Sequence, residues 1–267
     1  MSPRRAPRPF LLLPLLAWLW APGAPAAELA VDLELVLMVD VSGSVDAQEA
    51  ELQRRGYAAA LTNRRVVDAI RGGPTGRIAV TYVEWADDTY QNVVVGWTVL
   101  DGEESCRALA DKLTRAPVAT AFWTAIGSAI DYAARQFDGN GFEGTRQVID
   151  ISGDGYSNRG RSPAEARDEA VAAGIVINGL PILNTRPNPS GGLPPMDLDA
   201  YYRANVMGGP GAFVLAAEDF ASFGEAILSK LIKEIAALPE QPPESAPRAV
   251  QTAYPRDRGM ERAARGR

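Results

Sequence analysis

The sequence contains no histidine and only one cysteine among its 267 residues. Without histidine, the chain has no Ser-His-Asp triad, no histidine general base and no histidine-ligated zinc site. The single cysteine, Cys106, excludes an internal disulfide and a cluster of cysteine ligands. These absences exclude the commonest nucleophilic and zinc-based chemistries, so any metal site in this chain must be built from oxygen atoms.

Long apolar runs are also scarce. The run from Phe10 to Ala21 covers about 12 residues, which is too short to span a bilayer comfortably. It follows an arginine-rich start and precedes the small-residue cleavage site Ala24-Pro25-Ala26, a pattern typical of a secretory signal peptide in residues 1–26. We therefore expect an exported protein, periplasmic or secreted, with no transmembrane span after signal cleavage. An uncleaved N-terminal anchor is the alternative.

The other end of the chain, residues 239–267, holds five prolines and few large apolar residues, which predicts a disordered tail. The segment between the two ends, residues 27–238, has the usual size of one α/β domain. The formal net charge is −6, and both ends are rich in arginine, so the acidic residues concentrate in this domain. An acidic domain lacks the basic face that nucleic-acid binding requires.

Strand and helix signals alternate through the domain. They predict strands at 31–40, 77–88, 90–99, 146–154, 175–183 and 211–217, and helices at 46–71, 101–115, 121–137, 162–174, 196–206 and 218–237. The turn at Asp87-Asp88 is so short that its two strands must pair antiparallel. The pattern predicts a doubly wound α/β fold: a mainly parallel six-stranded sheet with one antiparallel edge strand and helices on both faces. A strand order of 3-2-1-4-5-6 would place the first and fourth strands side by side, at the reversal where ligands bind.

Oxygen-bearing side chains gather where these two strands end. Asp40, Ser42 and Ser44 follow the first strand, and alternate residues of an extended segment point the same way. Asp154 ends the fourth strand, and Thr124 opens a helix between the two. Two carboxylates and three hydroxyls suit Mg²⁺, or alternatively Mn²⁺ or Ca²⁺. Five protein oxygens leave an octahedral ion an open position, which a carboxylate from a partner protein would complete.

Three other interpretations of these residues remain open. Thr120 is an alternative to Thr124 as the hydroxyl donor. Asp40 and Asp154 could instead cap helices, with the serines only satisfying turn amides. A bound metal could also serve only to stabilise the fold, in which case capture of a partner would be unchanged by EDTA.

Two enzyme-like signals are weaker. The stretch GNGFEG, residues 139–144, fits dinucleotide-binding spacing, but it follows a helix and precedes a strand, so we expect no nucleotide. A haloacid-dehalogenase-like Mg²⁺-dependent phosphatase would also place an aspartate after its first strand. Here Ser42 and Asn158 stand where that chemistry needs acids, so protonation of the leaving group has no agent.

The oxygen donors resemble the metal-ion-dependent adhesion site (MIDAS) of the von Willebrand factor type A (VWA) family. Asp40-x-Ser42-x-Ser44 matches the first motif, Thr124 with the following Gly and Ala-Ile matches the threonine motif, and Asp154 in ISGDG matches the last aspartate. The family usually has Thr or Ser directly before that aspartate, where this chain has Gly153, which leaves direct or water-mediated contact by Asp154 open.

The resemblance covers residues 31–237. It is closest to the bacterial exported domain-of-unknown-function 1194 family, in the stretches TAIGSAI, IDISGDGYSN and YYRANVMGGPGAFV. It implies metal-dependent binding of a protein through an exposed Asp or Glu of that partner, and no catalysis.

Loops beside the metal are expected to set partner specificity. One is GYSNRGR, residues 155–161, and the other is NTRPNPSGGLPPMD, residues 184–197. The arginines in these loops would help to attract an acidic side chain. The predicted partner-binding rim consists of Tyr156, Asn158, Arg159, Arg161 and Arg186.

Overall fold

The computed structural model describes residues 27–184 and 195–237. The predicted signal peptide, the whole of the predicted tail and most of the predicted loop at 184–197 lie outside these residues. In chain order the elements are β1 (Leu29–Val31), β2 (Glu34–Asp40), α1 (Ala47–Leu61), α2 (Arg64–Arg71), β3 (Ile78–Trp85), β4 (Gln91–Leu100), α3 (Glu103–Arg115), α4 (Ile126–Arg135), β5 (Phe142–Gly144), β6 (Gln147–Gly153), α5 (Pro163–Ala172), β7 (Val176–Pro181), α6 (Leu198–Asn205) and α7 (Phe223–Ala236).

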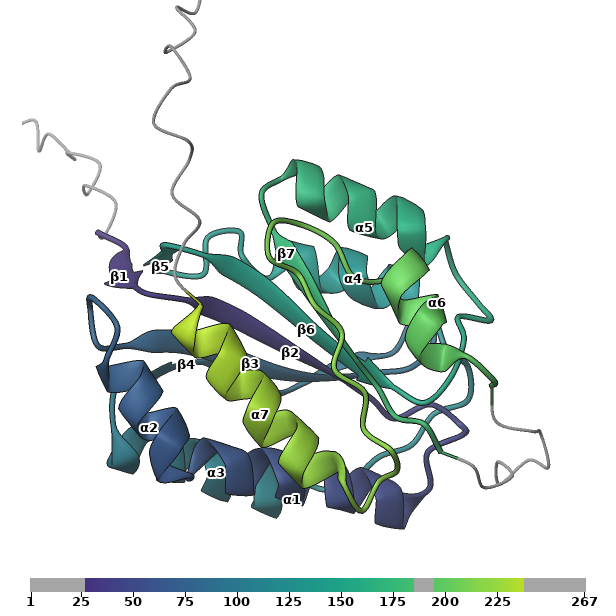
Figure 1. Ribbon diagram of the computed structural model, residues 1–267, viewed down its shortest axis with the longest axis horizontal. Helices are drawn as coiled ribbons and strands as arrows, with labels where there is room; N and C mark the ends of the chain where they lie inside the picture. Colours follow the sequence, from purple (N-terminus) through teal and green to yellow (C-terminus); the bar gives the residue numbers. More distant parts are fainter. Residues whose placement is uncertain (1–26, 185–194, 238–267) are drawn as a thin grey trace, which may run out of the picture.

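The central sheet has five strands in the order β4-β3-β2-β6-β7 (Figure 1). β2 pairs in parallel with β3 and β6, and β7 pairs in parallel with β6. β3 and β4 pair antiparallel across the short turn that contains Asp87 and Asp88. The predicted doubly wound α/β fold is confirmed, and the reversal of strand order falls between β2 and β6. β1 and β5 form a separate small parallel sheet that the sequence patterns did not predict.

The predicted sixth strand, at 211–217, is not a regular strand. Its strand pairing is limited to isolated bridges, from Val214 to Gly179 of β7 and from Ala217 to Ile182 just after β7. Leu215 donates to the carbonyl of Gly179 and Ala217 to that of Pro181. Pro181 has no N–H to donate in return, so the ladder is interrupted where a full strand would need it.

Helices cover both faces of the sheet, as predicted. α1, α2, α3 and α7 lie on one face, and α4, α5 and α6 lie on the other (Figure 1). Side chains of β2 pack into an apolar core on each face. Leu35 and Leu37 pack with Tyr57 and Phe223 on the first face. Met38 packs with α4 and α6 on the second. β2 is therefore buried on both sides, which explains its nearly continuous apolar sequence.

Three predicted helix boundaries were wrong. The helix expected from residue 218 begins only at Phe223. The helix expected at 46–71 breaks into α1 and α2, because the Asn63 side chain accepts the backbone N–H of Arg65 and starts a new helix. The helix expected from residue 121 begins only at Ile126. The amides of Ala121 and Ala125 donate instead to the carbonyls of Val41 and Ala86, at the ends of neighbouring strands.

Within the described residues, no helix has both the length and the apolar character needed to cross a membrane.

Candidate metal centre

The five predicted oxygen donors meet at one edge of the sheet. Asp40 is the last residue of β2, and Ser42 and Ser44 lie in the turn that follows. Asp154 directly follows β6, the parallel neighbour of β2. Thr124 lies two residues before α4. Because β2 and β6 run parallel, their carboxyl ends reach the same edge, and the loop before α4 crosses over it.

Hydrogen bonds link four of these side chains in a row. Thr124 Oγ1 donates to Ser42 Oγ at 3.2 Å, and the two serine hydroxyls lie 3.2 Å apart. Ser44 Oγ donates to Asp154 Oδ1 at 2.5 Å. Asp40 joins the row through its Oδ1, which accepts the backbone N–H of Ser42 at 2.7 Å. Residues up to 114 positions apart in the chain thus bring five oxygen-bearing side chains together.

The second oxygen of Asp40 fits a metal ligand. Asp40 and Ser42 are fully buried, and Asp154 is 3% exposed. Asp40 Oδ2 is buried and has no hydrogen-bond partner among the described residues. A buried carboxylate oxygen without a partner costs free energy that a hydrogen bond or a coordinated cation would offset. An all-oxygen set with such an atom suits a hard divalent cation.

Carboxylates alone would not make this a site. Within residues 27–184 and 195–237, no group of three or more His, Cys, Asp or Glu side chains could hold a metal ion. The site therefore depends on the hydroxyls of Ser42, Ser44 and Thr124 as much as on its two carboxylates.

Electrostatics at the site disfavour two free negative charges. Burial raises the pKa of Asp40 to about 8, and the charge of Asp154 adds to this shift. Burial likewise raises the pKa of Asp154 to about 6, against the hydrogen bond from Ser44, which lowers it. A divalent cation would favour the ionised form of both groups, because an opposite charge at short range outweighs the cost of burial.

Gly153 explains where this chain departs from the adhesion-site motif. A Cβ at this position would lie 2.7 Å from Asp40 Oδ2 and 2.8 Å from the hydroxyl of Tyr202. Tyr202, on α6, is fully buried, and its hydroxyl has no partner among the described residues. The usual Ser or Thr would collide with both groups, so glycine is required here by close packing.

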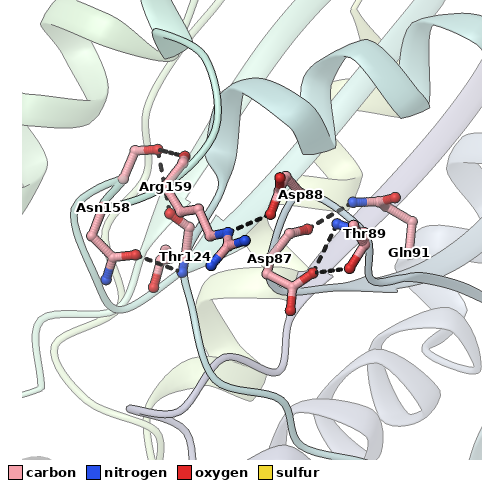
Figure 2. A network of polar contacts seen from close by, with 8 residues as sticks. Asp87, Asp88, Thr89, Gln91, Thr124, Asn158 and Arg159 are labelled. Atoms are coloured by element: carbon pink, nitrogen blue, oxygen red, sulfur yellow. Dashed lines mark hydrogen bonds and ion pairs between the residues drawn. The ribbon is translucent and has the colours of Figure 1, made fainter.

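The loop after β6 holds Thr124 in place. Asn158 Oδ1 accepts the backbone N–H of Thr124 at 2.9 Å, and the backbone N–H of Asn158 donates to the Thr124 carbonyl at 2.8 Å (Figure 2). Both contacts fix the segment before α4 against the loop that carries Asp154. Sequence patterns placed Asn158 on the partner-binding rim but did not show this positioning role, which depends on a contact across 34 residues.

The predicted rim is only partly assembled at the site. Tyr156 and Asn158 line a cleft of about 810 Å³ that also includes Ser44, Thr124 and Asp154. Arg159 forms an ion pair with Asp88 at 2.5 Å (Figure 2). Arg161 does not line the cleft; it pairs with Asp131 and Glu169 on α4 and α5. Arg186 lies outside the described residues.

Two of the alternative interpretations lose support from this geometry. The N-caps of all helices among the described residues are other residues, such as Asp46 for α1 and Ser162 for α5, so neither Asp40 nor Asp154 caps a helix. Thr120 lines the cleft but is exposed, whereas the Thr124 hydroxyl is buried against Ser42.

The strand order, with helices on both faces, gives a VWA-like fold, and comparisons with solved structures agree. Proximal thread matrix protein 1 from the mussel byssus, whose structure has a zinc-occupied MIDAS motif, matches with a TM-score of 0.54 at 14% identity, covering 79% of this chain and 50% of that one. The chain therefore spans about half the length of the mussel protein. A VWA protein from Catenulispora acidiphila matches with a TM-score of 0.51 at 16% identity, covering 77% and 43%.

An aerotolerance-related membrane protein from Bacteroides fragilis matches with a TM-score of 0.51 at 20% identity, covering 76% of this chain and 99% of that one. No curated protein matches in sequence. The family model described as "Protein of unknown function (DUF1194)" matches residues 30–239. The chain belongs to this family.

Proposed function

We propose that this protein is an exported module that binds a partner protein through a divalent metal ion, Mg²⁺ in the first place and Mn²⁺ or Ca²⁺ as alternatives. The observation that carries the proposal is the buried, unpartnered Asp40 Oδ2 beneath the row of contacts from Thr124 to Asp154. Asp40 would anchor the ion, and the three hydroxyls would donate lone pairs to it. Asp154, directly or through water, would balance its charge.

The partner would supply an Asp or Glu carboxylate. With two anionic protein ligands, the ion keeps enough charge to attract another carboxylate at short range. Such a side chain would reach the ion through the cleft that Ser44 and Asp154 line. The zinc-occupied MIDAS of the mussel protein supports divalent-metal binding by this kind of domain. Export rests on the signal-peptide pattern of residues 1–26, and no catalytic step is proposed.

Isothermal titration tests the metal half of this proposal. We expect heat from Mg²⁺ or Mn²⁺ with the wild-type protein and none with Asp40→Ala. Asp87→Ala is the matched control, because Asp87 is a half-buried turn carboxylate whose oxygen accepts the Thr89 amide and hydroxyl. Ca²⁺ and Zn²⁺ titrations rank the ions. Equal heat from wild type and Asp40→Ala would remove the site.

A second experiment tests the partner half. Pull-down from the envelope of the parent organism should retain candidates that are lost with EDTA and also lost with Asp40→Ala. If EDTA lowers the melting temperature but the captured proteins stay the same, the metal only stabilises the fold and the adhesion role is wrong.

A further inference from the structure

Exposed aromatic side chains surround the candidate metal centre. Phe122 is 87% exposed, Trp123 49% and Tyr156 40%, and all three line the cleft that contains Ser44 and Asp154. We call these three residues the aromatic rim. Isolated exposed apolar residues are ordinary, but three large rings around one polar cleft mark an interaction surface.

The backbone beneath the rim is fixed relative to the oxygen donors. The N–H of Gly43, between the two serines, donates to the carbonyl of Phe122 at 3.3 Å, and Ala121 donates to the carbonyl of Val41 at 2.8 Å. A Cβ on Gly43 would lie 2.9 Å from the Phe122 carbonyl oxygen, so the two segments touch. Trp123 directly precedes Thr124, which Asn158 holds. The backbone that carries Phe122 and Trp123 is therefore anchored beside the oxygen donors.

The two described arginines of the predicted partner-binding rim, Arg159 and Arg161, already form ion pairs. Arg159 lies over the ring of Trp123, 5.8 Å from its centroid. Its charge is paired with Asp88 (Figure 2). Such a contact orders the Trp123 ring and leaves little positive charge for a ligand. Arg161 is paired with acids on α4 and α5. The described residues that line the cleft include aromatic rings but no lysine or arginine, so among them a positive charge at the site would come from the ion.

Acidic groups make the cleft itself unfavourable for a carboxylate. Asp46 and Asp154 both line it. A partner's acid would therefore need the ion, whereas an apolar side chain beside that acid would gain by covering the rim. The two contributions are separable because one depends on metal and the other does not.

We propose that the aromatic rim selects partners in which the metal-binding Asp or Glu stands directly next to a large apolar side chain. This inference rests on the proposed metal-dependent function and adds the specificity of the same site. The partner's apolar side chain would pack against Phe122 and Trp123 while its neighbouring carboxylate enters the cleft between the rings. Aromatic residues in such a position dominate binding energy in many interfaces.

Three capped dipeptides test the inference on the full-length protein: N-acetyl-Asp-Phe-amide, N-acetyl-Asp-Gly-amide and N-acetyl-Asn-Phe-amide. Affinities are measured by NMR titration with and without saturating Mg²⁺. With Mg²⁺ we expect Asp-Phe to bind about tenfold tighter than Asp-Gly, because burial of the phenyl ring adds to the carboxylate contact. Asn-Phe should bind far more weakly than Asp-Phe, and Asp-Phe should lose its affinity without Mg²⁺.

A variant tests whether the Phe122 ring causes the preference for Asp-Phe over Asp-Gly. Phe122→Ser should reduce the preference for Asp-Phe to less than about threefold while leaving the affinities for Mg²⁺ and Asp-Gly unchanged, since this ring is mostly exposed and contributes little to folding. Leu29→Ser is the matched control: it also removes a partly exposed apolar side chain, but from β1, at the opposite end of the sheet. It should keep the full preference.

The outcomes separate the two proposals. Equal affinities of Asp-Phe and Asp-Gly under Mg²⁺ would overturn the selective rim and leave the metal-dependent function standing. Binding of Asn-Phe as tight as that of Asp-Phe would also overturn it, because the rim would then act without the ion. If neither Asp peptide binds although Mg²⁺ does, the carboxylate-binding function itself is wrong.

Discussion

Two of the groups of buried carboxylates on the central sheet are neutralised differently. In one, Asp150 on β6 and Glu234 on α7 share the ammonium of Lys230, at 2.6 Å and 2.5 Å. In the other, Asp40 and Asp154 face three hydroxyls, and no lysine or arginine among the described residues forms an ion pair with either. Buried carboxylates without a counter-charge are costly.

The position of each group explains the difference. Lys230 and Asp150 are fully buried between β6 and α7, where no ion from solution can enter, and the chain supplies its own cation. Asn178 on β7 completes this group by donating to Glu234 at 2.9 Å. The Asp40 group lies at the sheet edge and opens into the cleft. Where the sheet meets solvent, the cation can come from outside, and with it a partner.

Replacing Lys230 with methionine should have the largest effect on stability. Asp150 and Glu234 would stay buried without their cation, and removing one side of a buried ion pair costs about 3–5 kcal/mol. Urea unfolding measures the loss. Lys233→Met on the same helix is the control, because Lys233 is exposed and lies over the ring of Phe213. A loss below about 1 kcal/mol for Lys230→Met, as at ordinary surface positions, would show that the two groups do not differ in this way.

Mg²⁺ should stabilise the fold only by binding at the group that contains Asp40 and Asp154. At a Mg²⁺ concentration about a hundred times the dissociation constant, binding should add about 2.7 kcal/mol to the free energy of unfolding, since the ion binds the folded state alone. Thermal unfolding should show the gain, EDTA should reverse it, and Asp40→Asn should abolish it, while Asp87→Asn keeps it. A gain that survives in Asp40→Asn would place the stabilising ion elsewhere in the protein.

Rising pH should weaken the fold through Asp150. Burial raises the pKa of Asp150 from its ordinary 3.8 to about 7, and the Glu234 carboxylate adds to the shift. The folded protein then holds a proton that the unfolded chain releases, so this contribution is fully present below pH 3.8 and is lost as the pH rises through about 7. The slope is at most about 1.4 kcal/mol per pH unit.

The variant Asp150→Asn isolates this effect. It keeps the size of the side chain but cannot titrate, so the difference in unfolding free energy between wild type and variant should change between pH 4 and 7 and level off above that range. A difference that stays constant with pH would mean that Asp150 is ionised throughout, with Lys230 neutralising it completely.

Sequence patterns predicted the sheet better than the loops. Strand periodicity predicted the alternation of strands and helices, and the short turn at Asp87 predicted the antiparallel pair. Both signals are local in the sequence. The start of α4 could not be predicted in the same way. The segment before Ile126 has helix-compatible residues, but the amides of Ala121 and Thr124 bond to the end of β2 and to Asn158. Those partners are distant in sequence, so tertiary contacts override local propensity.

The candidate site was likewise predictable where its spacing is local. Asp40, Ser42 and Ser44 lie within five residues at the end of a buried strand, so their local spacing indicates a site. The ion pairs of Asp150 were not predicted, since Lys230 and Glu234 have the spacing of an ordinary surface pair on a helix. A signal did exist: Asp150 interrupts the apolar strand VIDI, and Lys230 falls between Leu231 and Ile227 on the buried side of α7.

The smallest expected effect concerns the contact between Asn158 and Thr124, which positions a ligand of the candidate metal centre. Within the described part of the chain, Thr124 is the one proposed metal ligand to which Asn158 hydrogen-bonds, so Asn158→Ala should weaken Mg²⁺ binding by about tenfold, as loss of a residue that orients a ligand does. Asn158→Asp should restore most of the affinity, because its carboxylate oxygen still accepts the Thr124 amide. Isothermal titration gives both values, with Asn205→Ala, on α6, as the control. Lys230 is held by its buried ion pairs with Asp150 and Glu234, whereas the metal centre relies on such a loop contact. Unchanged Mg²⁺ affinity in Asn158→Ala would therefore mean that the Thr124 hydroxyl is placed without the loop or does not bind the ion.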